Sequence, residues 1–312
     1  MLNAYSDDQL RLLARLYYVD GLGQLEVARL AKVSQAKVSR LLALARERGI
    51  VRITVADYDP RHPELEAALR RRLGLEEVTV VRTAGADPRA ATGHFGAAAV
   101  GRLIRPGDVV ALAGGRTLQA LVAHIPSDSA RRPVVVQAMG SVEPAVSAHD
   151  AQEIGRVLAR RLGGTFLALN APAFIPDKRA RDALLQLEQV REVQGRLARA
   201  RLALVGIGTL ANSVFVERGT LSGEMLRELQ RAGAVGEICG RFFDARGREC
   251  ATPWRDRVIS VGLPQLRRIP LVVAVVTGAD RAAALLAAVR SGLVKGLVVD
   301  EACAAALVEA AA

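Results

Sequence analysis

The chain has 312 residues, a formal net charge of +11 and 51% hydrophobic residues, enough for two domains with a sizeable core. No apolar run reaches the ~18 residues of a membrane-spanning helix, and Asp7 and Asp8 precede the first apolar segment, the reverse of a secretory signal. Three cysteines without C-x-x-C spacing favour buried thiols over a metal site or disulfides. We therefore expect a cytoplasmic protein without a membrane partner, and its basic charge suggests a polyanionic one.

Residues 1–56 predict three short helices. The first is predicted over residues 6–18, the second over 24–31, and the third over 34–48 with Ser34 as its N-cap. The tight turn between the last two is typical of a helix-turn-helix motif. The residues expected in their shared core are Leu10, Leu13, Ala14, Tyr17, Leu25, Ala28, Leu30, Val33, Val38, Leu41, Leu42 and Ala45.

The N-terminal half of the third helix carries hydrogen-bonding and cationic side chains on its outer face. In a helix-turn-helix these positions enter the major groove of double-stranded DNA and read base edges. A solvated charged helix face is the plainer alternative, but the spacing of small and apolar residues favours DNA binding. Lys32 stands where many such turns carry glycine, which predicts a turn of different shape. The predicted DNA-binding residues are Ser34, Gln35, Ala36, Lys37, Ser39 and Arg40.

A linker and an additional helix are predicted between residues 57 and 75. Pro63 stands in the first turn of this helix, where its missing N–H costs nothing. Leu65, Leu69 and Leu73 are spaced by four and form an apolar face. This face fits packing either on the next domain or on a second subunit.

From about residue 76, short apolar runs alternate with helical stretches such as 149–162 and 280–290. The runs are apolar on both faces, as are strands that helices cover on both sides. The pattern predicts an α/β domain with a Rossmann-like, largely parallel sheet, and residues 238–249 predict a small inserted hairpin. The predicted strands lie within residues 77–81, 108–115, 133–140, 165–172, 201–208, 271–278 and 296–301.

Several predicted strands end in glycine, and ligands of parallel sheets bind beyond the carboxyl ends of strands. Glycine there lets backbone N–H groups approach an anion, and the next helix adds a favourable dipole. The segment GGRT (114–117) is the strongest candidate, because Arg116 and Thr117 can also bind a phosphate. The steric alternative stays open, since tight strand-to-helix turns need glycine without any ligand. GGRT is neither a Walker A loop nor a G-x-G-x-x-G fingerprint, so a nucleotide cofactor is not favoured.

The order and spacing of several segments resemble the SorC/DeoR-type family of sugar-binding transcriptional regulators over nearly the whole chain. The resemblance implies a helix-turn-helix DNA-binding domain (1–56), a linker and helix (57–75), and a sugar-phosphate-type effector-binding and oligomerisation domain (76–312) similar to sugar-phosphate isomerases and CoA-transferases. It also implies a homo-oligomer, generally a tetramer, that binds operator DNA and responds to a phosphorylated sugar. The segments are VSQAKVSRLLALARERGIVRI, RPGDVVALAGGRTLQALV, VVVQAMGSVEP, ALVGIGTL, AGAVGEICGRFFDARGRE and DRVISVGLPQLRRIPLVVAVVTGADRAAALLAAVRSGLVKGLVVDE.

The resemblance also implies roles for individual residues. GGRT matches the family's phosphate-binding turn, and Glu237 stands where the family often has an aspartate that contacts sugar hydroxyls. Arg281 replaces a lysine of many members and keeps the cation with a different geometry. Met139 stands where some fructose-bisphosphate-sensing members have arginine, which argues against a bisphosphate effector. The predicted effector-binding residues are Gly114, Gly115, Arg116, Thr117, Gly140, Gly206, Gly208, Glu237 and Arg281.

Two classes of function are weighed: a ligand-responsive regulator, and a sugar-phosphate isomerase with an appended DNA-binding module. An isomerase needs an acid and a base beside the sugar carbonyl. None of the acidic residues near strand ends is paired with a second titratable group in a recognisable motif, so we favour a regulator that is not an enzyme. These residues are Glu143, Asp150, Glu237, Asp280 and Asp300.

Overall fold

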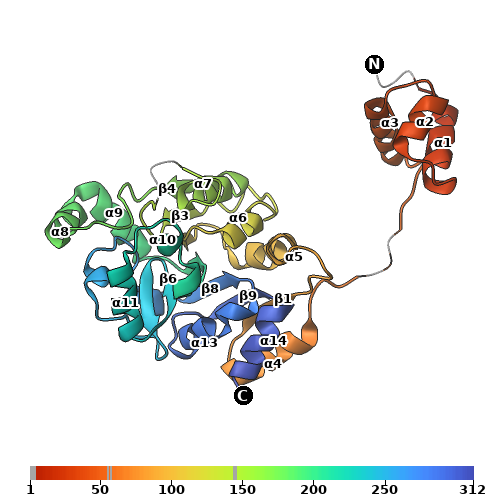
Figure 1. Cartoon of the computed structure of the whole chain (residues 1–312). Helices are drawn as coiled ribbons and strands as arrows, with labels where there is room; N and C mark the ends of the chain where they lie inside the picture. The colour runs from red at the N-terminus through yellow and green to blue at the C-terminus, as the bar shows by residue number, and fades with distance from the viewer. Residues whose placement is uncertain (1–4, 55, 57, 143–145) are drawn as a thin grey trace. The chain divides into compact units, whose positions relative to one another are not determined.

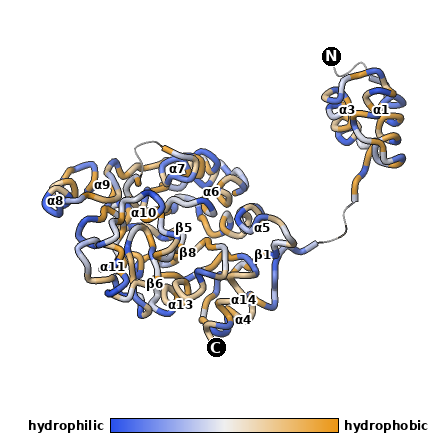
Figure 2. Tube along the Cα trace, in the orientation of Figure 1, coloured by the Kyte–Doolittle hydropathy of each residue, from blue (hydrophilic) through white to orange (hydrophobic). Residues whose placement is uncertain are grey.

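The structure, a computed structural model, describes residues 5–54, 56, 58–142 and 146–312. The chain forms two compact units, Met1–Tyr58 and Asp59–Ala312. The first is helical, and the second is a sheet with helices on both faces (Figure 1). Hydrophobic and hydrophilic residues alternate along the helices of both units, as amphipathic packing requires (Figure 2). No helix among the described residues is long and apolar enough to span a membrane.

The described residues of the first unit form three α-helices around one small core. Ser6 begins the first with a capping box to Gln9, and the Ser34 hydroxyl accepts a hydrogen bond from the Lys37 amide at the start of the third. Val27, Val38 and Leu41 are fully buried between them. The elements are α1 (Asp7–Ala14), a π-helical segment η2 (Arg15–Val19), α2 (Gln24–Leu30) and α3 (Gln35–Glu47).

Two residues expected in this core are outside it. Leu25 and Leu30 are 53% and 63% exposed, whereas Val27 and Ala28 of the same helix are buried. A helix as short as α2 can turn only one narrow face inward, and a face with Ala28 lets α3 approach closely. Leu25 and Leu30 flank that face on either side.

Lys32 makes the turn between α2 and α3 in a left-handed conformation, with φ of 53°. The Val33 amide donates to the Ala28 carbonyl (3.0 Å) and closes the turn. A lysine costs about 1 kcal/mol more than glycine in this conformation. The prediction of a different turn shape is therefore wrong, because Lys32 adopts the left-handed conformation that glycine favours.

The second unit is built on a seven-stranded, fully parallel sheet in the order β1-β9-β8-β5-β2-β3-β4. Each predicted run contains one strand, so the predicted fold class is confirmed. From the β5–β2 pair, the chain adds β3 and β4 on one side of the sheet and β8 and β9 on the other. This reversal of strand order makes the β5–β2 pair the switch point of the sheet. The strands are β1 (Glu77–Val81), β2 (Val109–Leu112), β3 (Val134–Gln137), β4 (Thr165–Leu167), β5 (Leu202–Val205), β8 (Leu271–Val276) and β9 (Gly296–Asp300).

Two helical layers cover this sheet. The helices α5, α6 and α7 contact one another in succession, and α4, α14 and α13 form a second contacting series (Figure 1). The helix bounds are α4 (Pro63–Leu73), α5 (Pro88–Leu103), α6 (Arg116–Val122), α7 (Ala151–Arg161), α8 (Lys178–Gln186), α9 (Glu188–Leu197), α10 (Val214–Glu217), α11 (Gly223–Arg231), α12 (Leu263–Arg268), α13 (Ala282–Arg290) and α14 (Glu301–Ala310). Short 3-10 turns are η3 (Leu210–Asn212), η4 (Pro253–Asp256) and η5 (Ala279–Arg281).

Helix α4 packs on β1 and α14 of its own unit, which decides between the two alternatives for its apolar face. The segment before it pairs with β1, since the His62 amide donates to the Val80 carbonyl (2.9 Å). The buried Glu66 carboxylate accepts hydrogen bonds from the Val80 amide (3.1 Å), Arg61 Nε (2.8 Å) and Arg70 Nη2 (3.4 Å). This cluster fastens the start of the second unit to its sheet.

The inserted hairpin consists of β6 (Ala234–Ile238) and β7 (Arg241–Asp244), so it begins four residues before the predicted segment. Cys239 and Gly240 form its turn, both with positive φ. Glu237 bridges to Gly208, which follows β5. The hairpin thereby brings the Glu237 side chain over the carboxyl end of the main sheet.

Candidate functional site

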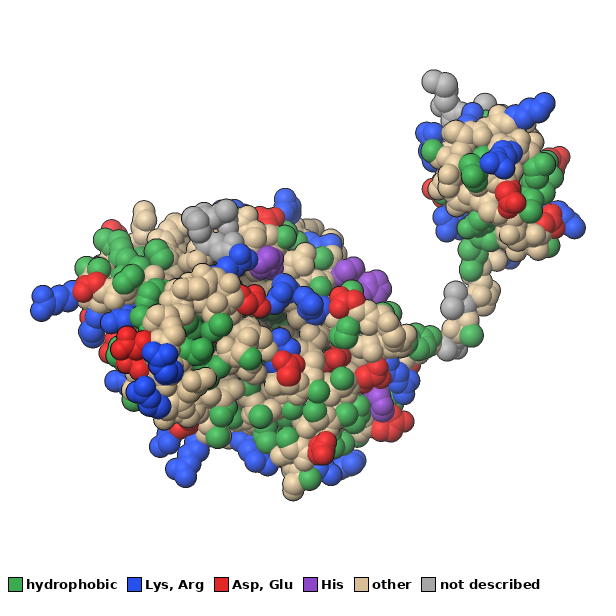
Figure 3. All heavy atoms as spheres, in the orientation of Figure 1, with side chains coloured by type: hydrophobic (Ala, Val, Ile, Leu, Met, Phe, Trp, Pro, Cys, Tyr) green, Lys and Arg blue, Asp and Glu red, His purple; other side chains and the backbone are tan. Residues whose placement is uncertain are grey.

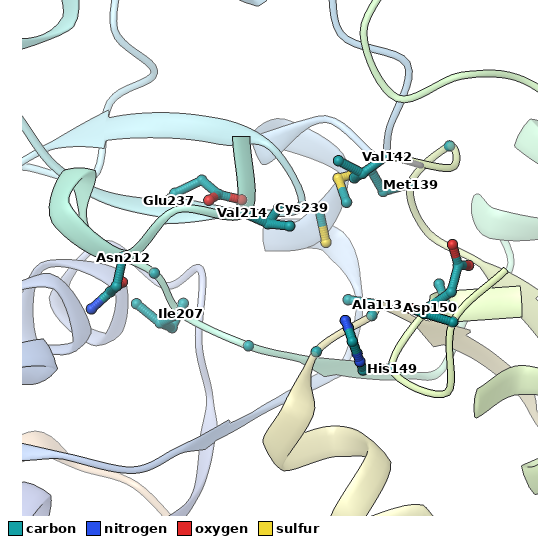
Figure 4. A pocket seen from close by; sticks show the side chains of 17 residues that line it. Ala113, Met139, Val142, His149, Asp150, Ile207, Asn212, Val214, Glu237 and Cys239 are labelled. Atoms are coloured by element: carbon teal, nitrogen blue, oxygen red, sulfur yellow. The ribbon is translucent and has the colours of Figure 1, made fainter. Parts of the chain in front are cut away.

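Two adjoining hollows lie at the carboxyl ends of β2, β3 and β5, beside the switch point of the sheet. The inner chamber (Figure 4) is lined by residues 113–115, 139, 140, 142, 147, 149–151, 206–208, 212, 214, 237 and 239. The outer basin is lined by residues 87–89, 115–117, 149, 212, 214, 217, 218, 275–278 and 281. Four residues line both hollows, so one ligand can occupy the two together.

The outer basin is cationic. Its arginines come from the start of α5 (Arg89), the start of α6 (Arg116), the end of α10 (Arg218) and η5 (Arg281). Basic side chains border a hollow on this face of the second unit (Figure 3). Arg116 forms an exposed ion pair with Glu217 (3.0 Å). Arg281 Nη1 donates to the Thr277 carbonyl (2.8 Å) and pairs with Asp280 (2.9 Å).

The GGRT segment forms the turn between β2 and α6. Gly115 has φ of 135° and ψ of 152°, a conformation that essentially only glycine adopts. Its amide donates to the His149 carbonyl (2.9 Å), so it is not free to bind a ligand. The first helical hydrogen bond runs from Gln119 to Gly115. The amides of Arg116, Thr117 and Leu118 therefore precede the hydrogen-bonding ladder, so donors are available at the start of the helix that follows the glycines.

The remaining strand-end glycines differ in whether the surrounding packing requires a glycine at their position. A Cβ on Gly140 would lie 2.5 Å from the Ala171 carbonyl oxygen, so close backbone packing explains that glycine. A Cβ on Gly208 would lie 3.3 Å from Glu237 Oε2. A Cβ on Gly206 would meet no atom within 4 Å, and its φ is not positive. Neither packing nor backbone strain requires glycine at 206, and the missing side chain leaves space in the inner chamber.

Glu237 lies at one end of the inner chamber, across from Asp150 (Figure 4). Its Oε2 accepts a hydrogen bond from the Ser213 hydroxyl and its Oε1 accepts one from the Gly240 amide, both at 2.8 Å. Burial raises the pKa of the Glu237 carboxyl above its ordinary value, and the two hydrogen bonds only partly offset this. The carboxyl can therefore carry a proton at a pH where an exposed glutamate is ionised.

Replacing Glu237 with glutamine should change how stability depends on pH. A raised folded-state pKa means that the folded chain binds the proton more tightly than the unfolded chain. The free energy of unfolding of the parent should therefore fall as pH rises from the ordinary glutamate pKa through the raised one. Glutamine cannot ionise, and its amide can still bond Ser213 and Gly240. We expect the melting temperature of Glu237→Gln to exceed that of the parent increasingly as pH rises; parallel pH profiles would contradict this.

All nine predicted effector-binding residues line these hollows. Six of them lie in the inner chamber, and Gly115, Arg116, Thr117 and Arg281 lie in the outer basin, with Gly115 in both. Sequence reasoning missed Arg89 as a basin residue. It directly follows the helix-start signal of Asp87 and Pro88 after β1, which could have placed it at the carboxyl edge of the sheet.

Of the acidic residues weighed for catalysis, Asp150, Asp280 and Asp300 make hydrogen bonds or ion pairs within the structure. Asp150 caps α7 by accepting the Gln152 amide (2.8 Å), and Asp300 accepts the Gly278 amide (3.0 Å). Asp280 pairs with Arg281 and accepts Asn212 Nδ2 (2.9 Å). Glu143 lies outside the described residues. Among the described residues no group of three or more His, Cys, Asp or Glu side chains could hold a metal ion.

In the first unit the predicted DNA-binding residues occupy the start of α3. All are exposed except Lys37, whose Nζ lies 5.0 Å from the centroid of the Tyr5 ring. Arg40 Nε donates to the Ala36 carbonyl (3.3 Å), so the guanidinium lies along its own helix. The N-terminal half of α3 thus exposes mainly polar and cationic side chains.

Comparison with known proteins gives consistent matches along the chain. The Sugar-bind family model, described as "Putative sugar-binding domain", matches residues 61–309. The erythritol catabolism regulatory protein EryD of Brucella abortus (strain 2308) is 31% identical over 311 residues, covering 98% of both chains. The crystal structure of the full-length sorbitol operon regulator SorC from Klebsiella pneumoniae matches with a TM-score of 0.74 at 26% identity, covering 97% of this chain and 100% of that one. A DeoR family transcriptional regulator from Listeria monocytogenes matches at 26% identity with a TM-score of 0.73, covering 78% of this chain and 98% of that one.

Proposed function

Since this chain belongs to the SorC/DeoR-type family of sugar-binding transcriptional regulators, we propose that it binds operator DNA through α3 under the control of a phosphorylated sugar or related small carbohydrate. The observation that carries the effector proposal is the cationic outer basin, where the free amides that begin α6 adjoin Arg116 and Arg281. A phosphate there meets backbone donors and cations together. The inner chamber then receives the carbohydrate, with Glu237 as an acceptor for its hydroxyl groups.

The Arg116–Glu217 ion pair gives the ligand a way to act on the protein. A phosphate at the first turn of α6 competes with Glu217 for Arg116 and repels the Glu217 carboxylate. Glu217 ends α10, so the ligated state favours a different position of that short helix. A ligand with different affinities for two positions of α10 shifts the equilibrium between them, as an effector must.

The phosphate contact can be tested with Thr117→Ala. A hydrogen bond to a charged group contributes about 1.5–3 kcal/mol, so the variant should bind a phosphorylated sugar about tenfold to a hundredfold more weakly. Its melting temperature without ligand should match the parent's. Thr165→Ala, at an exposed position on the edge strand β4, is the matched control. If the free sugar raises the melting temperature as much as its phosphate does, and Thr117→Ala responds like the parent, the phosphate lies elsewhere.

The DNA contact can be tested with Arg40→Ala. We propose that Gln35 and Arg40 contact base edges and that Lys37 contacts a base or a phosphate. A base contact is worth about 1–3 kcal/mol at the cognate site, so Arg40→Ala should weaken operator binding about fivefold to a hundredfold and random DNA much less. Arg46→Ala, at an exposed position late in the same helix, controls for loss of one charge. Equal weakening on operator and random DNA would make Arg40 a phosphate contact.

We further propose a cytoplasmic homo-oligomer, in line with the family's tetramers, because paired helix-turn-helix modules read half-sites on DNA more tightly than one module does. The chain is then a regulator and not an isomerase. Support for this comes from the structural roles of Asp150, Asp280 and Asp300 described above. Incubation with ribose, glucosamine and fructose phosphates should give no turnover, and conversion of any of them would favour the enzyme.

A further inference from the structure

Charge is divided unequally between the two hollows. Among the described residues, the outer basin is lined by four arginines and two carboxylates, Asp87 and Glu217, whereas the inner chamber is lined by two carboxylates, Asp150 and Glu237, and by no lysine or arginine. A phosphate in the inner chamber would face these carboxylates without a cation to offset them. A ligand that fills both hollows therefore has its charged end in the basin and an uncharged end in the chamber.

One wall of the inner chamber is apolar. Met139 follows β3, Val142 lies three residues later, and Cys239 comes from the hairpin turn. Figure 4 shows these three side chains across the chamber from His149. Met139 and Cys239 are buried, and burial raises the pKa of the Cys239 thiol to about 12, so this thiol is uncharged. This wall offers a ligand contact with hydrocarbon and sulfur.

Hydrogen-bonding groups of the chamber lie away from its apolar wall: among the described lining residues, Ser147, His149 and Asn212 carry polar side chains in addition to the carboxyl groups of Asp150 and Glu237. Each carboxylate oxygen of Glu237 already accepts one hydrogen bond, and Asp150 Oδ1 accepts a hydrogen bond from the Gln152 amide. These two carboxyl groups can still accept from a ligand hydroxyl near them. A hydroxyl against Met139, Val142 or Cys239 would lose its water without gaining an equivalent partner, which is unfavourable.

We propose that the effector is a phosphate monoester of a partly deoxygenated carbohydrate, with its phosphate in the outer basin and a methyl or methylene carbon against Met139, Val142 and Cys239. The inference rests on the proposed function and adds the chemical class of the ligand and its orientation. Met139 becomes a residue that determines specificity. A fully hydroxylated sugar phosphate fits the same hollows but leaves a hydroxyl group unpaired at this wall.

Calorimetric titration of the full chain with matched pairs of ligands tests whether the effector belongs to this chemical class. The pairs are 2-deoxyribose 5-phosphate with ribose 5-phosphate, and 6-deoxy-L-tagatose 1-phosphate with L-tagatose 1-phosphate; inorganic phosphate and fructose 1,6-bisphosphate complete the set. In a pair that binds, the deoxy member should bind about tenfold to a hundredfold more tightly, the discrimination typical of an apolar pocket against an added hydroxyl.

Each other outcome has a defined meaning. Equal or tighter binding of the hydroxylated member overturns the inference, as does tighter binding of the bisphosphate than of every monophosphate. Binding of inorganic phosphate with no gain from any ester also overturns it, because the chamber then holds no carbon chain. Failure of inorganic phosphate and of all esters to bind contradicts the proposed phosphate site itself and removes the inference with it.

A substitution in the apolar wall tests its contribution to ligand preference separately from that of the rest of the site. Met139→Gln keeps the length of the side chain and introduces hydrogen-bonding groups, so it should level or reverse the preference within the binding pair. Met225→Gln, on α11 and away from both hollows, should keep the parent's preference. Val142→Thr, which adds a hydroxyl at nearly constant volume, provides a second variant if Met139→Gln does not fold. Unchanged preference in a folded variant of either residue contradicts the assignment of the wall.

Discussion

Replacing Gly206 with leucine should abolish binding of the effector while the chain stays folded. Gly206 does not have a positive φ, and an added Cβ meets no atom within 4 Å. A leucine side chain there occupies the inner chamber that the carbohydrate would fill. We expect affinity for a phosphorylated sugar to fall at least about a hundredfold, equivalent to about 2.7 kcal/mol, as measured by calorimetric titration.

Gly195→Leu provides the matched control for this substitution. Gly195 lies on α9, and an added Cβ there also meets nothing within 4 Å. Leucine is a better helix former than glycine by about 0.8 kcal/mol, so this control should be at least as stable as the parent and bind the ligand normally. A folded Gly206→Leu that binds the phosphorylated sugar as tightly as the parent would show that the ligand lies outside the inner chamber.

Replacing Glu66 with alanine should lower the free energy of unfolding by roughly 3 kcal/mol, the upper range for a buried hydrogen bond to a charged group. The change leaves the Val80 amide without its acceptor and separates Arg61 and Arg70 from the carboxylate that joins them. The two arginines are about 40% exposed, so water can solvate them and the loss stays below that of a fully buried pair. Chemical denaturation of the full chain measures the effect.

Glu64→Ala controls for the loss of one carboxylate from the same helix. The Glu64 side chain is 74% exposed and pairs with His62 and Arg82, so its removal should change stability by less than about 1 kcal/mol. Similar losses for the two variants would mean that the Glu66 cluster does not fasten the start of the second unit.

The strands and helix caps could be predicted because their signals are local. Each apolar run of the second unit contains a strand, and Ser6 and Ser34 each cap the helix that they precede. Periodicity failed for α2, because in so short a helix Leu25 and Leu30 flank the buried face without belonging to it. The sequence pattern shows which residues are apolar, and tertiary packing determines which of these residues become buried.

The details of the site depend on residues far apart in the sequence. Whether the Gly115 amide is free depends on the His149 carbonyl, and whether Gly140 is needed for packing depends on Ala171. The glycines of this site look equivalent in the sequence, yet only the fold distinguishes Gly206, which leaves space in the chamber, from Gly140. The assignment of these residues to an effector stays a prediction.

The central claim is that one carbohydrate phosphate controls binding of this chain to a specific DNA sequence. The most direct test selects bound fragments from random-sequence DNA with the full chain and then measures its affinity for the selected sequence with and without each phosphorylated sugar. We expect one sequence to be enriched, and at least one sugar phosphate to change the affinity about fivefold to a hundredfold, the usual range of coupling between two sites, while its dephosphorylated form has little effect. Absence of any enriched sequence, or an affinity for DNA that no carbohydrate phosphate changes, would contradict the account.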